Sequence, residues 1–237
     1  MAVSHGAKMI SLFRIGEHRP MSESDVRQSG RSGASATMRR FAIVRLIRGA
    51  LPDAARYQLP TKRALILVDF FNPMDFEGGA ALARPALRAA QKTAKLKARL
   101  RRARVPAIFA NDNFGHWESE FSTLVSRCAT LPGVPGEIAR LLRPQGDDRS
   151  VLKPRHSAFY GTPLEFLLEE LGSRELIITG IAADSCVAIT AHDAHVRKFK
   201  VWIPSDCVAS ETPQYTRNAL DHLRRVAKAL TAPSTSR

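Results

Sequence analysis

Cysteine is scarce in this sequence, with only Cys128, Cys186 and Cys207 among its 237 residues. So few cysteines, and an odd number of them, exclude a fold that is held together by a disulfide framework. The scarcity favours a reducing environment, in which a single thiol is free to take part in chemistry. We therefore predict a cytoplasmic protein in which any one of the three thiols is either a core residue or a reactive group.

Long apolar runs are also missing from the sequence. No stretch reaches the roughly eighteen consecutive apolar residues that a membrane-spanning helix needs. The segment 1–20 lacks the apolar core of a secretory signal. The sequence therefore predicts no association with a membrane. With 44% hydrophobic residues in 237, the chain is long enough to bury one substantial core.

Acidic residues are outnumbered, at 22 against 36 basic residues, so the formal net charge is +14. Such an excess suggests nucleic acid as a partner, because lysine and arginine neutralise phosphates. Aromatic residues are only 7% of the chain, however, and no RNA-binding motif or zinc-finger spacing accompanies the charge. We do not expect nucleic acid as the partner, and a non-catalytic basic nucleic-acid-binding protein stays as the alternative.

The first 60 residues differ from the rest in composition. The segment Met21–Met38 is rich in serine and glycine and has little apolar content, which is typical of a linker or a disordered segment. We predict a basic, flexible extension over 1–60, or a start placed too early with Met38 as the true one, and one domain over 61–237. A functional basic arm is the other interpretation of this segment.

From Lys62 onward, short apolar runs alternate with helical patterns. The predicted strands are Ala64–Val68, Val105–Ala110, Ser150–Leu152, Glu175–Thr179 and Lys200–Ile203, with a sixth near Val226–Leu230. Helices are predicted over 82–103, Glu137–Leu142, Pro163–Leu171, 185–195 and Pro213–Lys228, and the region Asn111–Pro135 is predicted to be rich in loops. This alternation predicts an α/β fold, a doubly wound parallel sheet of five to six strands with helices on both faces, in a single domain.

Three reactive side chains follow predicted strands. Asp69 ends the first strand, Lys153 the third, and Cys186 begins the helix after the fourth, with Asp184 or Ser185 as its cap. Ligands of such sheets bind at the carboxyl ends of the strands, so we expect the three to meet there. The helix N-terminus and the Lys153 ammonium both favour a thiolate at Cys186, and Asp69 is placed to take its proton. The alternative is that each is structural, Cys186 as a small buried apolar residue.

The strings LILVDFFNPM, VLKPRHSAF and TGIAADSCVAITAHDA resemble the isochorismatase-like cysteine hydrolases over about Lys62–Lys228. This resemblance implies a catalytic triad of Asp69, Lys153 and Cys186, and a cis peptide bond between Ile181 and Ala182. It also implies an oxyanion hole formed by the amides of Ala182 and Cys186, and a homo-oligomer. The implied function is cleavage of a C–N bond in a small amide or carbamoyl compound through a thioester. Cleavage of an ester or vinyl ether at the same site is the alternative.

The sequence departs from the nicotinamidase branch of this family after the second strand. That branch carries Asp-x-His as part of a metal site, whereas here the stretch 111–114 ends in Phe114. We expect no metal and no cofactor; coordination by His116 with His156 is the alternative, although a metal site needs at least three converging ligands. Candidate residues that line the substrate pocket, or that are plain core, are Phe70, Asn72, Phe114, Trp117 and Phe159.

Overall fold

The computed structural model describes residues 62–117 and 120–236, so the predictions for 1–60 lie outside the described residues. Within the described part no helix is long and apolar enough to cross a membrane. The strands are β1 (Arg63–Val68), β2 (Ala107–Asp112), β3 (Arg149–Lys153), β4 (Glu175–Ile181), β5 (Lys200–Trp202) and β6 (Val208–Ala209). The α-helices are α2 (Gly79–Arg102), α3 (Phe121–Thr130), α4 (Gly133–Leu141), α5 (Leu164–Glu170), α6 (Cys186–Val196) and α7 (Pro213–Val226).

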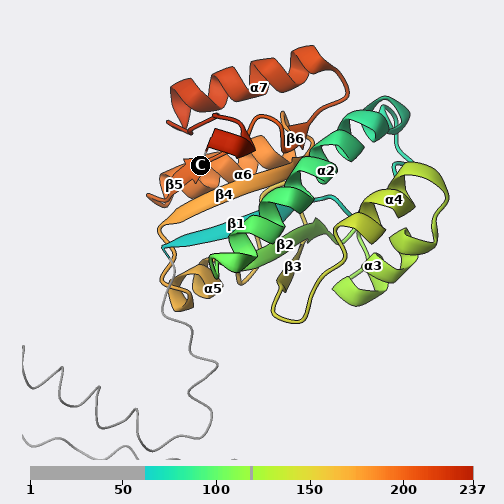
Figure 1. Cartoon of the computed structure of the whole chain (residues 1–237), viewed down its shortest axis with the longest axis horizontal. Coiled ribbons are helices and arrows are strands. Elements are labelled where there is room, and N and C mark those ends of the chain that lie inside the picture. Colours follow the sequence, from blue (N-terminus) through green and yellow to red (C-terminus); the bar gives the residue numbers. More distant parts are fainter. Residues whose placement is uncertain (1–61, 118–119, 237) are drawn as a thin grey trace, which may run out of the picture. The chain divides into compact units, whose positions relative to one another are not determined.

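The strands form one parallel sheet in the order β3-β2-β1-β4-β5, and β6 pairs with β4 beyond the end of β5 (Figure 1). The central strand β1 is buried on both faces, which is why its sequence is a continuous apolar run. Ala64, Ile66 and Val68 point to one face and join one hydrophobic cluster. Leu65 and Leu67 join the cluster on the opposite face. The predicted doubly wound α/β fold is confirmed.

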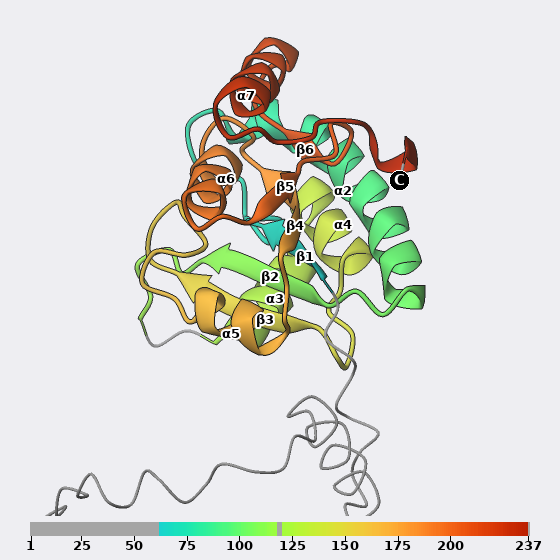
Figure 2. The same ribbon diagram turned by 90° about the vertical axis from the view of Figure 1, so that its left-hand side faces the viewer.

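Helices cover both faces of the sheet (Figure 2). One cluster combines strand residues with Leu164 and Leu168 of α5 and with Val187 and Ala191 of α6. The other combines strand residues with the buried stripe of α2 and with residues of α3 and α4. Because α5, α6 and α7 lie on one side and α2, α3 and α4 on the other, the sheet edges at the carboxyl ends of the strands stay available for a site.

The prediction of a loop-rich region after the second strand was wrong. The region Asn111–Pro135 contains α3 and the start of α4 rather than loops alone, because its few apolar residues still place Leu124 and Cys128 one turn apart on the buried side. Helix α4 begins at Gly133, among glycine and proline residues that argue against a helix. Gly136 is needed there, since a Cβ would lie 2.0 Å from the carbonyl oxygen of Leu131.

The sixth strand also lies elsewhere than predicted. It is β6, Val208–Ala209, whose two residues pair with Gly180 and Ile181 of β4. The predicted segment near Leu230 contributes one isolated bridge to Trp202 instead. A two-residue strand has too little sequence pattern to be recognised, so its position follows from its pairing partner.

Candidate active site

The order of the strands reverses between β1 and β4, and this is where ligands bind in open α/β sheets. Asp69 follows β1 with a left-handed backbone, φ 52°, a conformation that aspartate tolerates better than most residues. Its backbone amide donates to the carbonyl of Ala110, 3.0 Å away. Its carboxylate Oδ1 accepts from the amide of Asp112 at 2.7 Å. Both bonds hold the carboxylate at the edge of the sheet.

Lys153 is the last residue of β3, and its side chain is fully buried. Its Nζ lies 2.8 Å from Asp69 Oδ2 and 3.5 Å from Asp112 Oδ2. The side chain therefore reaches past β2 to the end of β1. Two carboxylates offset the cost of burying this ammonium.

Cys186 is the first residue of α6, and its Sγ lies 3.7 Å from Lys153 Nζ. Ser185 is at the N-cap position but makes no side-chain capping bond. Asp184 does not cap the helix either, because its Oδ1 accepts from the hydroxyl of Ser210 at 2.6 Å. The predicted side-chain cap is thus replaced by a bond that anchors the turn to the segment after β6.

The peptide bond between Ile181 and Ala182 is cis, as the resemblance implied. In the turn that follows, the amides of residues 183, 184, 185 and 187 all donate hydrogen bonds. Within the described part of the chain, the amides of Ala182 and Cys186 donate no hydrogen bond. These two amides are therefore available to an oxyanion beside Sγ, and their role as an oxyanion hole stays a prediction.

Burial and charge set the protonation of the three groups. Burial raises the pKa of Asp69, and the Lys153 ammonium offsets part of this rise. The pKa of Lys153 is lowered by burial but raised more by the acidic groups around it, Asp69 first, so that it ends above its ordinary value. The pKa of Cys186 is raised to about 12, by burial and by the Asp69 carboxylate, against the lowering effect of Lys153. The resting group is therefore a thiol, whereas the sequence favoured a thiolate.

Two further residues contact the three groups, although sequence reasoning assigned Asp112 no role and His156 only that of an alternative metal ligand. His156 Nδ1 is 3.4 Å from Cys186 Sγ. The carboxylate of Asp112 contacts Lys153 and accepts from the amide of Phe114 at 2.7 Å. Asp112 pairs in register with Lys153, and the sequence signal that could have identified it is its place just after the apolar run of β2, like that of Asp69 after β1. His156 lies on the loop after β3, whose path the sequence did not reveal.

The predicted pocket residues occupy different environments. Phe70 and Phe159 are buried in the two hydrophobic clusters, and Phe159 packs against Phe199 with ring centroids 6.0 Å apart. Asn72 is half-buried, and its Oδ1 accepts from the amide of Met74 at 2.8 Å. Phe114 and Trp117 expose 38% and 78% of their surface. A substrate-lining role for any of them stays a prediction.

The stretch after β2 does not fit a metal ion of the nicotinamidase kind. Phe114 has no ligand atom, and the Asp112 carboxylate already contacts the Lys153 ammonium. Among the described residues, no group of three or more His, Cys, Asp or Glu side chains is arranged to hold a metal. His116 contacts this stretch through its backbone, donating its amide to the carbonyl of Asn113 at 2.9 Å.

Known proteins share this arrangement of elements. Two solved structures similar to the chain are an N-carbamoylsarcosine amidase from Thermoplasma acidophilum and a nicotinamidase/pyrazinamidase from Bacillus subtilis. The first is 27% identical with a TM-score of 0.59, over 75% of this chain and 99% of that chain. The second is 28% identical with a TM-score of 0.58, over 73% of this chain and 100% of that chain.

Sequence comparison agrees with the structural similarity. An uncharacterized isochorismatase family protein of Bacillus subtilis, YaaI, is 35% identical over 164 residues, which are 69% of this chain and 90% of that protein. The ureidoacrylate amidohydrolase RutB of Enterobacter is 27% identical over 195 residues, 72% of this chain and 84% of that protein. Residues 63–234 match the family model of the isochorismatase domain. The predicted family is confirmed, and the chain belongs to the isochorismatase family.

Proposed function

We propose that this protein is a cysteine hydrolase that cleaves a C–N bond of a small amide or carbamoyl compound through a thioester intermediate. The observation that carries the proposal is the position of Lys153 Nζ, 2.8 Å from Asp69 Oδ2 and 3.7 Å from Cys186 Sγ. An acid–base group, a buried cation and a nucleophile thus share one point. Relatives whose names state an activity, the N-carbamoylsarcosine amidase, the nicotinamidase and the ureidoacrylate amidohydrolase, act on C–N bonds.

The first half of the reaction forms the thioester. Because the pKa of Cys186 is raised to about 12, its proton must leave as the nucleophile attacks. Asp69, whose pKa burial raises, takes that proton while Sγ bonds to the carbonyl carbon. The amides of Ala182 and Cys186 hold the oxyanion. The C–N bond then breaks as Asp69 returns the proton to the leaving nitrogen.

The second half releases the acid. Water adds to the thioester carbon and gives a proton to Asp69, and the tetrahedral intermediate expels Sγ, which regains the proton. Lys153 stays protonated throughout, because the surrounding negative charges raise its pKa. Its fixed positive charge lies beside Sγ and Oδ2, so it stabilises negative charge at whichever of the two atoms carries it.

The proposal is tested by measuring ammonia release from a panel of small amides and carbamoyl compounds, with nicotinamide, N-carbamoylsarcosine and ureidoacrylate included. Cys186→Ala should abolish release while the circular dichroism spectrum is unchanged. Cys207→Ala, which removes a buried thiol elsewhere, should keep the activity. An acid quench should leave an acyl group on Cys186 that intact-mass spectrometry detects. Full activity in Cys186→Ala would reject the nucleophile. Hydrolysis of matching esters, followed by acid release, without ammonia release from any amide or carbamoyl compound would reject the C–N bond.

A second test concerns metal. Because Phe114 and Asp112 do not fit a metal of the nicotinamidase kind, prior treatment with a chelator should leave the rate of ammonia release unchanged. Loss of the rate, with recovery on adding zinc or iron, would contradict the proposed chemistry.

A further inference from the structure

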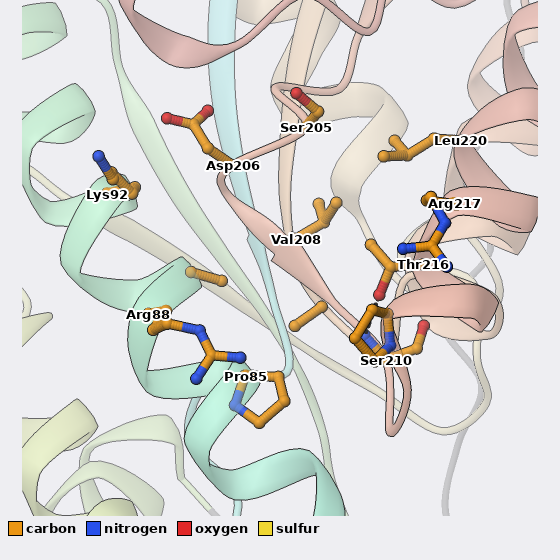
Figure 3. Close-up of a pocket in the computed structure, with 13 residues that line it drawn as sticks. Pro85, Arg88, Lys92, Ser205, Asp206, Val208, Ser210, Thr216, Arg217 and Leu220 are labelled. Carbon is orange, nitrogen blue, oxygen red and sulfur yellow. Dashed lines mark hydrogen bonds between the residues drawn. The ribbon is translucent and has the colours of Figure 1, made fainter.

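A cavity of about 470 Å³ lies away from the proposed nucleophile, between residues of α2 and α7 over the strand β6 (Figure 3). This volume is in the range of small-molecule sites. None of the residues that line it is Asp69, Lys153 or Cys186. The cavity is therefore separate from the candidate active site.

Positive charge faces this cavity from two helices. Arg88 of α2 and Arg217 of α7 line opposite walls, and their guanidinium groups point toward the space between them (Figure 3). Among the described residues Arg88 has no ion-pair partner, and the guanidinium of Arg217 donates to the neutral side chain of Gln214 at 2.7 Å. Two guanidinium groups that face each other without an acid between them attract an anion.

The one acidic residue that lines the cavity is already engaged. The carboxylate of Asp206 accepts from the amide of Ser234 at 2.6 Å and from its hydroxyl at 2.8 Å. It forms no ion pair with Arg88 or Arg217 in the part of the chain that the structure describes, and its two oxygens are held toward Ser234. The remaining walls include apolar side chains, namely those of Pro85, Ala89, Val208, Pro213 and Leu220. This combination fits a ligand with an anionic head and an apolar body.

The floor of the cavity is bonded to the turn that carries Cys186. Ser210 lines the cavity and donates its hydroxyl to Asp184 Oδ1 at 2.6 Å. Ala209, which also lines it, accepts at its carbonyl from the amide of Ala183 at 2.8 Å. Residues 183 and 184 lie within three positions of the proposed nucleophile. A ligand in the cavity thus rests on residues that position that turn.

We propose that this cavity is a second binding site, which takes a small organic anion with a carboxylate or phosphate head between Arg88 and Arg217. The apolar body of the ligand packs against Val208 and Leu220, and its presence alters the environment of Cys186 through Ser210 and Ala209. The binding part does not depend on the proposed function, because it is measured without turnover. Only the effect on Cys186 involves the site described above.

Binding is tested by isothermal titration of the full-length protein with benzoate, phenyl phosphate and the neutral benzyl alcohol. At least one anion should bind, benzyl alcohol should not, and the better anion identifies the head group. Arg88→Gln and Arg217→Gln should each weaken binding by about tenfold, the loss expected for one charge-assisted hydrogen bond. Arg84 is exposed on the same helix and does not line the cavity, so Arg84→Gln should bind the anion as tightly as the parent does.

Three results would overturn the binding site. The first is an absence of heat with both anions at millimolar concentration. The second is an unchanged affinity in both arginine variants, because the anion would then bind elsewhere, including at Cys186. The third is a change of oligomeric state in either variant by light scattering, which would show that a second copy of the chain covers the cavity. The effect on Cys186 is tested by its rate of alkylation by iodoacetamide, which the anion should change in the parent, and in Arg217→Gln only at about tenfold higher anion concentration. An unchanged rate at saturating anion would reject the coupling.

Discussion

The ammonium of Lys153, the last residue of β3, and the carboxylate of Asp69, the residue after β1, form a buried ion pair across β2, with Nζ 2.8 Å from Oδ2. Lys153 is fully buried and Asp69 is 4% exposed, so water solvates neither charge well enough to offset the cost of its burial. Each group would be costly to bury alone, and each makes the other tolerable. Each charge thus depends on the other for its burial, and the same pair is the acid–base part of the proposed chemistry.

Replacing Lys153 should destabilise the protein as well as inactivate it. In Lys153→Met the Asp69 carboxylate stays buried without its cation, which is expected to cost about 3–5 kcal/mol. Urea denaturation followed by circular dichroism measures the free energy of unfolding. The double variant Asp69→Asn/Lys153→Met, which removes both charges, should recover much of this loss. If the loss of unfolding free energy in the double variant equals the sum of the losses in Asp69→Asn and Lys153→Met, the pair contributes no coupling energy.

Replacing Asp69 should make Cys186 more reactive toward alkylation while it abolishes turnover. The carboxylate raises the pKa of the thiol, whereas Lys153 lowers it, so Asp69→Asn removes a raising charge and keeps the lowering one. The pKa of Cys186 should fall from about 12. Each unit of this fall should increase the alkylation rate at pH 8 by about threefold, since more thiolate forms but each thiolate is a weaker nucleophile.

Peptide mapping after iodoacetamide treatment separates Cys186 from the two fully buried cysteines. Labelling of Cys128 and Cys207 should be equally slow in the parent and in Asp69→Asn, which controls for general loosening of the fold. A slower reaction of Cys186 in the variant would mean that the carboxylate helps to form the thiolate in the resting protein.

Buried thiols should make the protein sensitive to alkaline pH. Burial raises the pKa of Cys207 from 9.0 to about 12. Between these values the unfolded chain releases the proton and the folded chain retains it, so stability is complete below pH 9 and falls as the pH rises. The loss from this one group is at most about 1.4 kcal/mol for each pH unit.

Cys207→Ala should therefore show a smaller fall in the free energy of unfolding between pH 8 and pH 11 than the parent does. Val208→Ala removes apolar volume next to it but no titrating group, and it should keep the pH dependence of the parent. If Cys207→Ala and Val208→Ala have the same pH dependence, the Cys207 thiol does not titrate with a raised pKa.

What the sequence predicts well here is the part that depends on strand pattern. Asp69 and Lys153 follow apolar runs, so their positions at one edge of a parallel sheet follow from the fold class. The pKa of Cys186 could not be predicted in the same way, because it depends on how far burial and Asp69 outweigh Lys153. A helix N-terminus and a nearby lysine, taken alone, indicate the opposite direction.

Contacts made by loops could not be predicted from the sequence either, because they depend on the path of the chain in three dimensions. His156 is 30 positions from Cys186, and the 3.4 Å between Nδ1 and Sγ depends on the path of the segment after β3. The bond between Ser210 and Asp184 likewise depends on β6, which is too short to show a pattern. Neither contact arises from a periodic element, so periodicity cannot reveal it.

His156 should assist the nucleophile through its Nδ1 atom. When Asp69 has taken the thiol proton, an N–H at Nδ1 can donate to the thiolate across the present 3.4 Å. His156→Ala should lower kcat by about tenfold, the effect of one hydrogen bond to a charged group. His156→Asn places an amide N–H near the same point and should restore part of that loss. Equal kcat in the parent and the alanine variant, or no advantage of asparagine over alanine, would exclude this role.

The glycine that precedes the cis peptide should be intolerant of any side chain. Gly180 pairs with Val68 across β4 and β1, at φ 135°, and a Cβ there would lie 2.1 Å from the carbonyl oxygen of Val68. Gly180→Ala must therefore separate the two central strands or change the backbone that leads to Cys186. We expect a loss of about 3 kcal/mol or more in the free energy of unfolding, together with loss of activity.

Gly146 provides the matched control, because a Cβ at this position meets nothing within 4 Å. Gly146→Ala should change the stability by no more than about 0.5 kcal/mol. Thermal and urea denaturation of both variants, beside ammonia release, measure the difference. Because the two substitutions are chemically identical, the difference between them reports the contact with Val68 together with the positive φ of Gly180, and not the general effect of replacing glycine. Similar stability in the two variants would mean that the strands can separate at little cost, and that the close contact of β1 with β4 does not hold the Cys186 turn in place.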